Sequence, residues 1–469
     1  MDKPDWKKIM NTQKQSKNRR YSSAPSGARP GGFGRRNGGY KGKSKFSTSS
    51  GSDGESRGGQ RSGNSFGYIN RSGEQQFSKQ GRSRDNWKRK NRRKSSEVID
   101  HSRYISKPVQ AQLVEACVIE NSFRDFNLHP TLLKNISDRG YIQPTKIQDM
   151  SIPHILKGRD VLGTGNTGTG KTGAFLIPMC QKVLKNPENR VLIITPTREL
   201  ASQIQVEFRK FTRDTKLRMV LVIGGESMHF QMRALREKPQ FVVATPGRLM
   251  DLEKRNQLSL KGFTNIILDE VDQMLDMGFV EDIKIVCGKL PENRQSLFFS
   301  ATMAGKEEAL ANTLLRDPVK VEADKQSPLN SIHQDIVKVA SKEHKIQILH
   351  DLLKKTEFTK VLVFSGTRIG ADRITQELRS RGVMVDSLHG NKSQRVRTKV
   401  LTNFRTDKID VLVATDVAAR GIDVPDISHV INFDEPVNYN DYIHRIGRTG
   451  RVGKKGTALT FVVSKSFSK

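Results

Sequence analysis

Eight residues from Gly165 to Thr172 read Gly-Asn-Thr-Gly-Thr-Gly-Lys-Thr and match the pattern of a phosphate-binding loop. Glycines let backbone amides converge on the β- and γ-phosphate oxygens of a nucleotide, and Lys171 neutralises the charge there. The hydroxyl of Thr172 can ligate Mg²⁺, and the helix expected after it points its positive end at the phosphates. The predicted phosphate-binding residues are Gly165, Gly168, Thr169, Gly170, Lys171 and Thr172.

An acidic pair follows 98 residues after Lys171, at the end of the apolar run Asn-Ile-Ile-Leu that begins at Asn265. Such a run is typical of a buried strand, so Asp269 is expected at its tip and Glu270 just beyond it. There Asp269 would hold a hydrated Mg²⁺, and Glu270 would orient and deprotonate an attacking water. An acidic pair alone is common, but beside a phosphate loop it predicts hydrolysis of a nucleoside triphosphate.

These residues need a scaffold, and the chain from about Phe123 onward provides one. Short apolar runs alternate there with helical stretches, which is the pattern of a parallel sheet covered on both faces. A less regular stretch at about 320–345 interrupts the pattern, which then restarts. We therefore expect an α/β protein with a tail at 1–105, one α/β domain at 106–325 and a second at 326–469.

The charge of the chain indicates a polyanionic partner. The formal net charge is +32, and residues 1–100 hold 25 Lys and Arg against 8 Asp and Glu. The tail is rich in Gly, Ser and Arg with single aromatics, so it is expected to be disordered and to make loose contacts with RNA. A solubilising linker is the alternative. The basic run Asn86–Lys94 suits either nuclear import or phosphate binding.

Targeting signals are absent from the sequence as given. The first residues hold no apolar signal-peptide core, and no run approaches the length of a membrane span. The singletons Cys117, Cys180 and Cys287 are expected to be buried thiols in a reducing compartment. We expect a cytoplasmic protein, with the nucleus as the alternative in a eukaryote, no membrane partner, no further domain after the last strand, and a monomer.

Further motifs occur in register along the chain. They are GYIQPTKIQ (Gly140–Gln148), GNTGTGKT, PTRELA (Pro196–Ala201), GG (Gly224 and Gly225), TPGR (Thr245–Arg248), DEVD (Asp269–Asp272) and SAT (Ser300–Thr302), followed by VFSGT, LHGNKSQRVR, ATDVAARGIDV and HRIGRTGR. This series resembles the DEAD-box RNA helicases of superfamily 2 from about Phe123 to the C-terminus. The resemblance implies two RecA-like domains in tandem that couple ATP hydrolysis to RNA unwinding or remodelling.

The resemblance also implies roles around ATP. Gln148 would read the adenine edge while Phe123 stacks on the base, and Gly421 and Asp423 would approach the ribose. Arginines of the second domain would reach the γ-phosphate and stabilise the charge of the transition state. These arginine fingers are Arg448 and Arg451, bridged to the other motifs by His444. The residues implied to couple the nucleotide state to domain closure are Asp272, Ser300 and Thr302.

RNA is implied to lie across both domains. The implied contacts are Thr197, Arg198, Gly225, Thr245 and Arg248 in the first domain, with Thr367, Arg397 and Thr415 in the second. Glycine amides, hydroxyls and arginines suit phosphates and 2′-hydroxyls rather than base edges. We therefore expect binding of single-stranded RNA or short duplexes without sequence preference. Any one of the hydroxyls could instead be only a helix cap.

Three residues depart from the family pattern: Val271 and Gly165 stand where alanine is usual, and Lys146 where a second proline is common. None removes a catalytic group, so we expect effects on rate and not on the reaction. Three other functions are weighed against the helicase: an ATP-gated RNA clamp or assembly platform, a DNA-directed enzyme of superfamily 2, and a nucleotide-binding scaffold without turnover. The last is disfavoured because Lys171 and both acidic residues are present with the two arginines.

Overall fold

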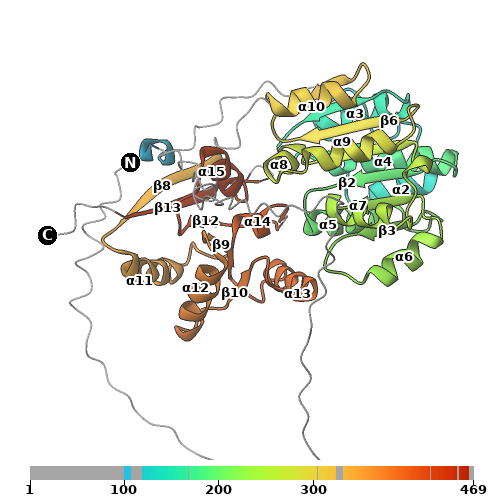
Figure 1. Cartoon of the computed structure of the whole chain (residues 1–469). Coiled ribbons are helices and arrows are strands. Elements are labelled where there is room, and N and C mark those ends of the chain that lie inside the picture. Colours follow the sequence, from blue (N-terminus) through green and yellow to red (C-terminus); the bar gives the residue numbers. More distant parts are fainter. Residues whose placement is uncertain are drawn as a thin grey trace, which may run out of the picture. The chain divides into compact units, whose positions relative to one another are not determined.

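The computed structural model describes residues 100–106, 119–166, 168–303, 305–323, 331–422, 424–451 and 454–463. The described residues form two α/β units, each built on its own parallel sheet, so the predicted fold is confirmed (Figure 1). We call residues 119–323 the N-terminal lobe and residues 331–463 the C-terminal lobe. The predicted tail up to residue 99, Cys117 and the predicted domain boundary at 325 lie outside the described residues.

The N-terminal lobe contains a seven-stranded sheet in the order β3-β4-β2-β5-β6-β1-β7, with every strand pair parallel. Its strands are β1 Val161–Thr164, β2 Val191–Ile194, β3 Met219–Val222, β4 Phe241–Ala244, β5 Asn265–Asp269, β6 Gln295–Ser300 and β7 Val319–Glu322. Its helices are α2 Pro130–Asp138, α3 Lys146–Leu156, α4 Lys171–Lys185, α5 Arg198–Phe211, α6 Met228–Arg236, α7 Pro246–Lys254, η3 Leu260–Gly262, α8 Val271–Asp276, α9 Val280–Lys289 and α10 Lys306–Leu314.

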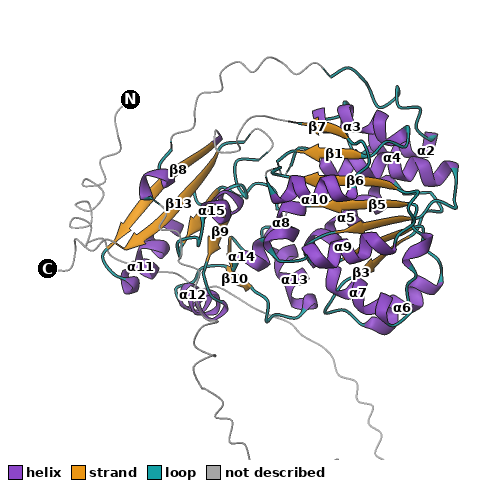
Figure 2. Ribbon diagram, turned by 45° about the horizontal axis from the view of Figure 1, so that its top comes forward, coloured by secondary structure: helices purple, strands orange, loops and turns teal. Residues whose placement is uncertain are grey.

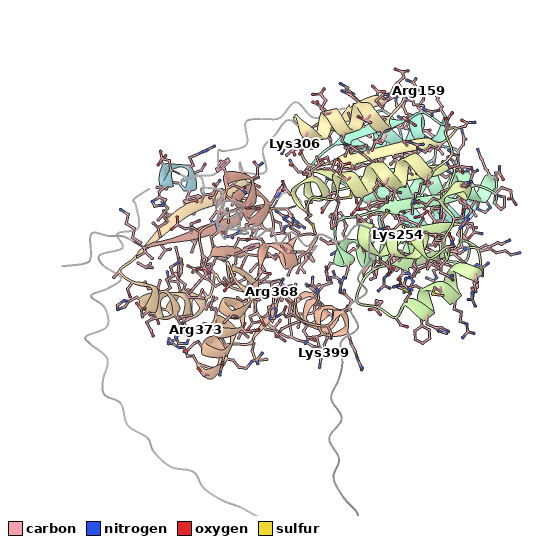
Figure 3. All side chains as sticks on the ribbon, in the orientation of Figure 1. Arg159, Lys254, Lys306, Arg368, Arg373 and Lys399 are labelled. Atoms are coloured by element: carbon pink, nitrogen blue, oxygen red, sulfur yellow. The ribbon has the colours of Figure 1, made fainter. Side chains whose placement is uncertain are left out.

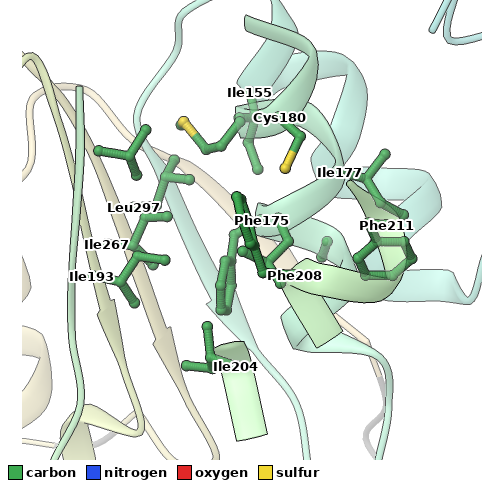
Figure 4. Close-up of a cluster of buried hydrophobic side chains, with 14 of the residues drawn as sticks. Ile155, Phe175, Ile177, Cys180, Ile193, Ile204, Phe208, Phe211, Ile267 and Leu297 are labelled. Atoms are coloured by element: carbon green, nitrogen blue, oxygen red, sulfur yellow. The ribbon is translucent and has the colours of Figure 1, made fainter. Parts of the chain in front are cut away.

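The apolar runs of the central strands are continuous because both faces of this sheet are covered. Ile193 and Ile267 point into one core cluster, where they meet Phe175 of α4 (Figure 4). Their neighbours Leu192 and Leu268 point into a second cluster on the opposite face. Helices therefore enclose the sheet from both sides (Figure 2), and only the strand ends remain for polar residues.

The C-terminal lobe contains a six-stranded parallel sheet in the order β10-β11-β9-β12-β13-β8. Its strands are β8 Ile332–Val339, β9 Val361–Phe364, β10 Val385–Leu388, β11 Val411–Ala414, β12 His429–Asn432 and β13 Gly456–Val463. Its helices are α11 Lys342–Leu353, α12 Arg368–Ser380, α13 Gln394–Arg405, α14 Asp416–Ala419 and α15 Tyr439–Ile446. Two core clusters again lie on opposite faces.

The stretch at about 320–345 was predicted to be less regular and to interrupt the strand–helix pattern, but its described residues continue that pattern. Most of β7, all of β8 and the start of α11 lie there. Both strands form edges of their sheets, and several of their side chains are half-buried or exposed. A strand covered on one side only carries polar residues between apolar ones, so it lacks the continuous apolar run that marks the central strands.

A short ordered segment precedes the N-terminal lobe. Residues His101–Tyr104 form the 3₁₀ helix η2, and Ser106 pairs with Gln334 of β8 in an antiparallel bridge. The tail was predicted to be disordered up to residue 105, and this prediction is wrong for residues 100–105, because they pack against the C-terminal lobe. Among the described residues, no helix is long and apolar enough to cross a membrane. Cys180 and Cys287 are buried, as predicted, and burial raises the pKa of the Cys287 thiol to about 11.

Candidate active site

The motifs of the N-terminal lobe meet at the carboxyl ends of its strands, where ligands bind in open α/β sheets. The phosphate loop follows β1, Asp269 ends β5 and Ser300 ends β6. These three strands are neighbours, and Thr164 at the end of β1 is paired with Ser300. The fold therefore brings residues from three separate motifs to one edge.

The phosphate loop has the backbone that its glycines were predicted to allow. Gly168 and Gly170 have φ angles of 92° and 97°, in the left-handed region that favours glycine. Gly170 caps α4, whose first residues are Lys171 and Thr172. The Lys171 side chain is only 7% exposed and donates from Nζ to the Gly165 carbonyl at 2.7 Å. The lysine thus lies folded into the loop that it was predicted to serve.

Gln148 lies against the phosphate loop rather than in solvent. Its Oε1 accepts from the backbone N–H of Thr145 at 3.0 Å, which completes a capping box at the start of α3. Its Nε2 donates to the Gly170 carbonyl at 3.1 Å. A Cβ added to Gly170 or Gly173 would come within 2.7 Å or 2.6 Å of Nε2. One amide therefore links the loop predicted to read adenine with the loop predicted to hold phosphate.

The acidic pair is buried, and its charge is costly there. Asp269 and Glu270 are 2% and 4% exposed. Burial raises the pKa of Asp269 to about 7 against the opposing charge of Lys171, and burial likewise raises the pKa of Glu270. Glu270 also has a φ of 53°, which is uncommon for a residue with a side chain. Its Oε2 is buried with no hydrogen-bond partner among the described residues.

The residues predicted to couple the motifs are only partly brought together. The backbone N–H of Asp272 donates to Ser300 Oγ at 3.3 Å. The carboxylate Oδ2 of Asp272 lies 3.9 Å from His444 Nε2 of α15. Thr302 is exposed, and its side chain makes no hydrogen bond within the described residues. Ser300 and His444 thus both meet Asp272, while Thr302 does not.

The predicted RNA contacts of the N-terminal lobe follow β2, β3 and β4 at the same carboxyl edge. The Arg198 guanidinium lies over the glycine pair, so closely that a Cβ at Gly225 would collide with it. Arg248 donates from Nη1 to the Glu226 carbonyl at 3.2 Å and to Gln231 Oε1 at 3.0 Å. Thr245 precedes α7 as its N-cap, and the Thr197 hydroxyl caps α5 by accepting from the Leu200 N–H.

The predicted RNA contacts of the C-terminal lobe begin helices. Thr367 and Thr415 are the N-caps of α12 and α14, and the Thr367 hydroxyl accepts from the Gly370 N–H at 2.9 Å. Arg397 is 7% exposed and donates from Nε to Glu199 Oε1 at 2.8 Å. Further exposed cations, such as Lys399 on α13, were not singled out by the sequence (Figure 3).

The arginine motif of the C-terminal lobe begins in the last turn of α15 and continues into the residues that follow this helix. Arg448 donates to the carbonyls of His444 and Ile422 at 3.2 Å and 2.9 Å, and Arg451 donates to the Gly447 carbonyl at 3.0 Å. Burial raises the pKa of Glu270, and the positive charge of Arg448 opposes this rise more strongly than any other neighbouring charge.

No role was predicted from the sequence for Arg445, which belongs to the same motif. It is 2% exposed and donates twice to the Asp416 carboxylate, at 2.5 Å and 2.8 Å, and once to the Asp434 carbonyl at 2.7 Å. Arg445 is visible in the sequence as a cation inside the motif, and Asp416 as an acid 29 residues earlier. Nothing in the sequence indicates that the two side chains form an ion pair. Arg445 fastens α15 to the start of α14.

Family models match both lobes. The DEAD/DEAH box helicase family matches residues 145–310, and the helicase conserved C-terminal domain matches residues 344–453. The chain belongs to the DEAD/DEAH box helicase family. The predicted family resemblance is thereby confirmed.

Relatives of this DEAD/DEAH box protein include the ATP-dependent RNA helicase CshA of Listeria monocytogenes. It is 41% identical over 343 residues, which cover 72% of this chain and 66% of that protein. The DEAD-box ATP-dependent RNA helicase RhpA of Helicobacter pylori is 39% identical over 365 residues, covering 77% and 74%. The match thus spans just under two thirds of the length of CshA.

Solved structures show the same two-lobed fold. Saccharomyces cerevisiae Dbp5 bound to RNA and ADP BeF3 is 32% identical, with a TM-score of 0.66 over 74% of this chain and 90% of that chain. The DEAD-box helicase Mss116 bound to ssRNA and UDP-BeF is 28% identical, with a TM-score of 0.66 over 73% and 74%. The predicted RecA-like tandem is confirmed by these structures.

Two predicted nucleotide contacts differ in their surroundings from what the sequence suggested. Phe123 is 4% exposed, with its ring 6.1 Å from that of Phe126 and 6.4 Å from that of Tyr141. Stacking on a base would require this loop to open, and that role stays a prediction. Gly421 accepts from Gln203 Nε2 at 2.9 Å through its carbonyl, and Asp423 lies outside the described residues.

The donor set also bears on the metal. No group of three His, Cys, Asp or Glu that could hold a metal ion is found among the described residues. A dedicated protein cage is therefore not indicated in that part of the chain. Mg²⁺ is commonly held by one or two protein oxygens together with substrate phosphates. The Asp269 carboxylate and the Thr172 hydroxyl fit that mode, because both stand at the edge where the phosphate loop ends.

Proposed function

We propose that this chain is an ATP-dependent RNA helicase, which couples ATP binding and hydrolysis to local RNA unwinding or remodelling. One observation carries the proposal: a buried carboxylate, Glu270, stands without a partner for Oε2 beside a phosphate loop whose lysine is already in place. The names of the relatives support ATP and RNA as ligands, since CshA and RhpA are described as ATP-dependent RNA helicases and Dbp5 was solved with RNA and ADP BeF3.

In the N-terminal lobe, Lys171 would exchange its bond to the Gly165 carbonyl for the phosphate oxygens of ATP. Glu270 would accept a proton from the attacking water, because a raised pKa brings a carboxylate closer to the range in which a general base works best. Asp269 and Thr172 would hold Mg²⁺, which neutralises phosphate charge when bound. Binding this cation would also stabilise the charged form of Asp269.

The C-terminal lobe would complete the site with Arg448 and Arg451. Planar cations stabilise the charge that spreads over the transferred phosphoryl group, an effect worth ~10³–10⁵ in rate. Both side chains are held by backbone carbonyls, so their orientation is set before the substrate arrives. His444, at 3.9 Å from the Asp272 carboxylate, would link α15 to the acidic motif.

RNA would bind through hydroxyls, amides and arginines and not through base readers. Arg198 over the glycine pair and Arg248 at the start of α7 present guanidinium groups at one edge of the N-terminal lobe. Such donors suit phosphates and 2′-hydroxyls, so we propose binding of single strands or short duplexes without sequence preference. We further propose that the protein acts as a monomer in the cytoplasm, or in the nucleus of a eukaryote.

The first test measures steady-state ATP hydrolysis with no nucleic acid, with single-stranded RNA and with DNA of the same sequence. Strong stimulation by RNA alone is the expected result. Equal stimulation by DNA, or none by either, would contradict the proposal. Displacement of a short RNA duplex then separates a helicase from an ATP-gated clamp, because a clamp would hydrolyse ATP and hold the RNA without releasing the strand.

A further inference from the structure

Residues 100–106, which we call the anchor, pack against the C-terminal lobe through their longest side chains. Tyr104 is 1% exposed, and its ring centroid lies 4.7 Å from that of Tyr442. The Arg103 guanidinium lies 3.8 Å above the ring of Tyr439. His101 lies 3.2 Å from the carboxylate of Glu435. Side chains of three different types thus hold one short segment.

Backbone contacts fix the anchor as well. Ser106 and Gln334 exchange two hydrogen bonds, with N–H···O distances of 3.1 Å and 2.8 Å, and so extend the edge of the sheet at β8. The side chain of the same Gln334 accepts a hydrogen bond from the Tyr442 hydroxyl at 2.9 Å. The anchor, β8 and α15 are therefore joined through one glutamine.

The contacts of the anchor converge on α15 and the loop before it. Glu435 precedes this helix, Tyr439 is its first residue and Tyr442 lies in its middle. Tyr104 and Tyr442 belong to one small core cluster with Ile332, Ile446 and Ala458. Without Tyr104, the side of α15 that carries Tyr442 and Ile446 would lose the ring that covers it.

The other end of α15 carries the groups proposed to act on the γ-phosphate. His444 lies in its last turn, and Arg448 follows it and donates back to the His444 carbonyl at 3.2 Å. The helix is only 8 residues long, or about 12 Å at 1.5 Å per residue. So short a helix is not stable alone and depends on its packing for position. A shift at its first turn is therefore transmitted to its last.

We propose that the anchor positions α15, so that residues 100–106 are required for full ATP turnover although they touch neither nucleotide nor RNA. Tyr104 is the principal positioning residue, because it is the one residue of the anchor that is buried, and it belongs to the cluster that covers α15. This inference rests on the proposed function, since it acts through Arg448. It separates the anchor from residues 1–99, whose excess of Lys and Arg suits RNA affinity and not catalysis.

Two deletions differ by only seven residues and test this separation. A chain lacking residues 1–99 keeps the anchor and is expected to retain the kcat for ATP at saturating RNA within about twofold, because loose phosphate contacts add affinity and not turnover. A chain lacking residues 1–106 is expected to lose about tenfold to hundredfold in kcat, the size of effect that small misplacements of catalytic groups produce. Equal kcat values for the two chains would overturn the proposal.

Point variants of Tyr104 repeat the test without shortening the chain. Tyr104→Ala is expected to lower kcat about tenfold while the KM for ATP stays within about twofold, because the phosphate and adenine residues lie in the other lobe. Tyr104→Phe is the matched control, since it keeps the ring, and the Tyr104 hydroxyl makes no hydrogen bond within the described residues. A Phe variant as impaired as the Ala variant would contradict positioning by packing.

A double-variant cycle distinguishes positioning from simple loss of stability. If Tyr104 acts through Arg448, then Tyr104→Ala is expected to lower kcat no further in an Arg448→Ala background. Multiplicative losses would overturn the proposal. Arg103→Ala is a milder change to the same segment, because Arg103 is exposed and the variant loses the contact with Tyr439 while Tyr104 stays buried. A wild-type chain without RNA-stimulated hydrolysis would refute the proposed function instead of the anchor.

Discussion

Buried charged side chains of the two lobes differ in how fully they are hydrogen-bonded. In the N-terminal lobe, Asp269 and Glu270 are buried with raised pKa values, and one carboxylate oxygen of Glu270 has no hydrogen-bond partner among the described residues. In the C-terminal lobe, Arg445 is just as buried but donates to Asp416, Asn432 and the Asp434 carbonyl. The acidic pair of the N-terminal lobe is incompletely satisfied, whereas the Arg445 guanidinium of the C-terminal lobe is paired with a carboxylate.

This difference indicates which lobe depends on its ligand. The unsatisfied Glu270 carboxylate raises the free energy of the folded N-terminal lobe until a cation or a water reaches it. The bidentate pairing of Arg445 fixes the position of α15 before any ligand binds. Arg448 and Arg451, which follow this helix, are therefore expected to need little rearrangement. Binding energy is therefore expected to change the N-terminal site more than the C-terminal one. Three variants test this contrast.

The largest effect is expected from Glu270→Gln. The amide cannot accept the proton of the attacking water, so RNA-stimulated kcat is expected to fall about 10²–10⁴-fold. Without nucleotide, the unfolding free energy is expected to stay equal or rise. The reason is that the change removes a carboxyl group whose pKa is raised by burial. Turnover is measured by single-turnover hydrolysis, and stability by urea unfolding.

The control for this change is Glu281→Gln, which lies in an exposed pair with Lys284 and is expected to alter neither quantity. Retention of turnover within about tenfold would mean that another group is the base. A loss of stability would mean that Glu270 has a stabilising partner, and the contrast between the lobes would then fail.

Asp416→Asn is expected to have the next largest effect, on stability. It weakens the paired hydrogen bonds to Arg445 and leaves a buried cation, so the unfolding free energy is expected to fall by about 2 kcal/mol. The exposed pair changed by Glu281→Gln provides the comparison, because such pairs contribute about 0–1 kcal/mol. Similar losses for the two variants in urea unfolding would show that pairing does not organise the C-terminal lobe.

The smallest effect is a dependence on pH that belongs to Asp269. Its folded-state pKa of about 7 lies above the usual 3.8, so the stability it confers is full below pH 3.8 and is lost as the pH rises through 7. The unfolding free energy of Asp269→Asn, relative to that of the wild type, is expected to rise by about 1 kcal/mol as the pH increases from about 6 to about 8. A stability difference independent of pH would mean that the carboxyl does not titrate in this range.

Much of the scaffold could be predicted from the sequence. Buried central strands form continuous apolar runs, so β2 and β5 were evident, and the position of Asp269 followed from β5. The edge strands β7 and β8 were missed, because partial exposure mixes polar with apolar residues. Local pattern thus revealed the strands that form apolar runs and failed at these two edges, where polar and apolar residues are mixed.

Tertiary pairing could not be predicted in the same way. Tyr104 looked like one of the single aromatics of the tail, because its partner Tyr442 is 338 residues away in the sequence. Arg445 and Asp416 each looked like an ordinary charge within a motif. The left-handed φ of Glu270 was also invisible, since no glycine marks that position. Such features depend on where separate segments meet and not on local composition.

The amide of Gln148 has a further consequence in evolutionary terms. It occupies the space that a side chain at Gly170 or Gly173 would need, and it accepts from one loop while donating to the other. None of the three positions can therefore drift alone. A descendant that adopts a larger residue at either glycine must first shorten residue 148, and would lose the capping box of α3 in the same step. The start of α3 and the phosphate loop are therefore inherited together.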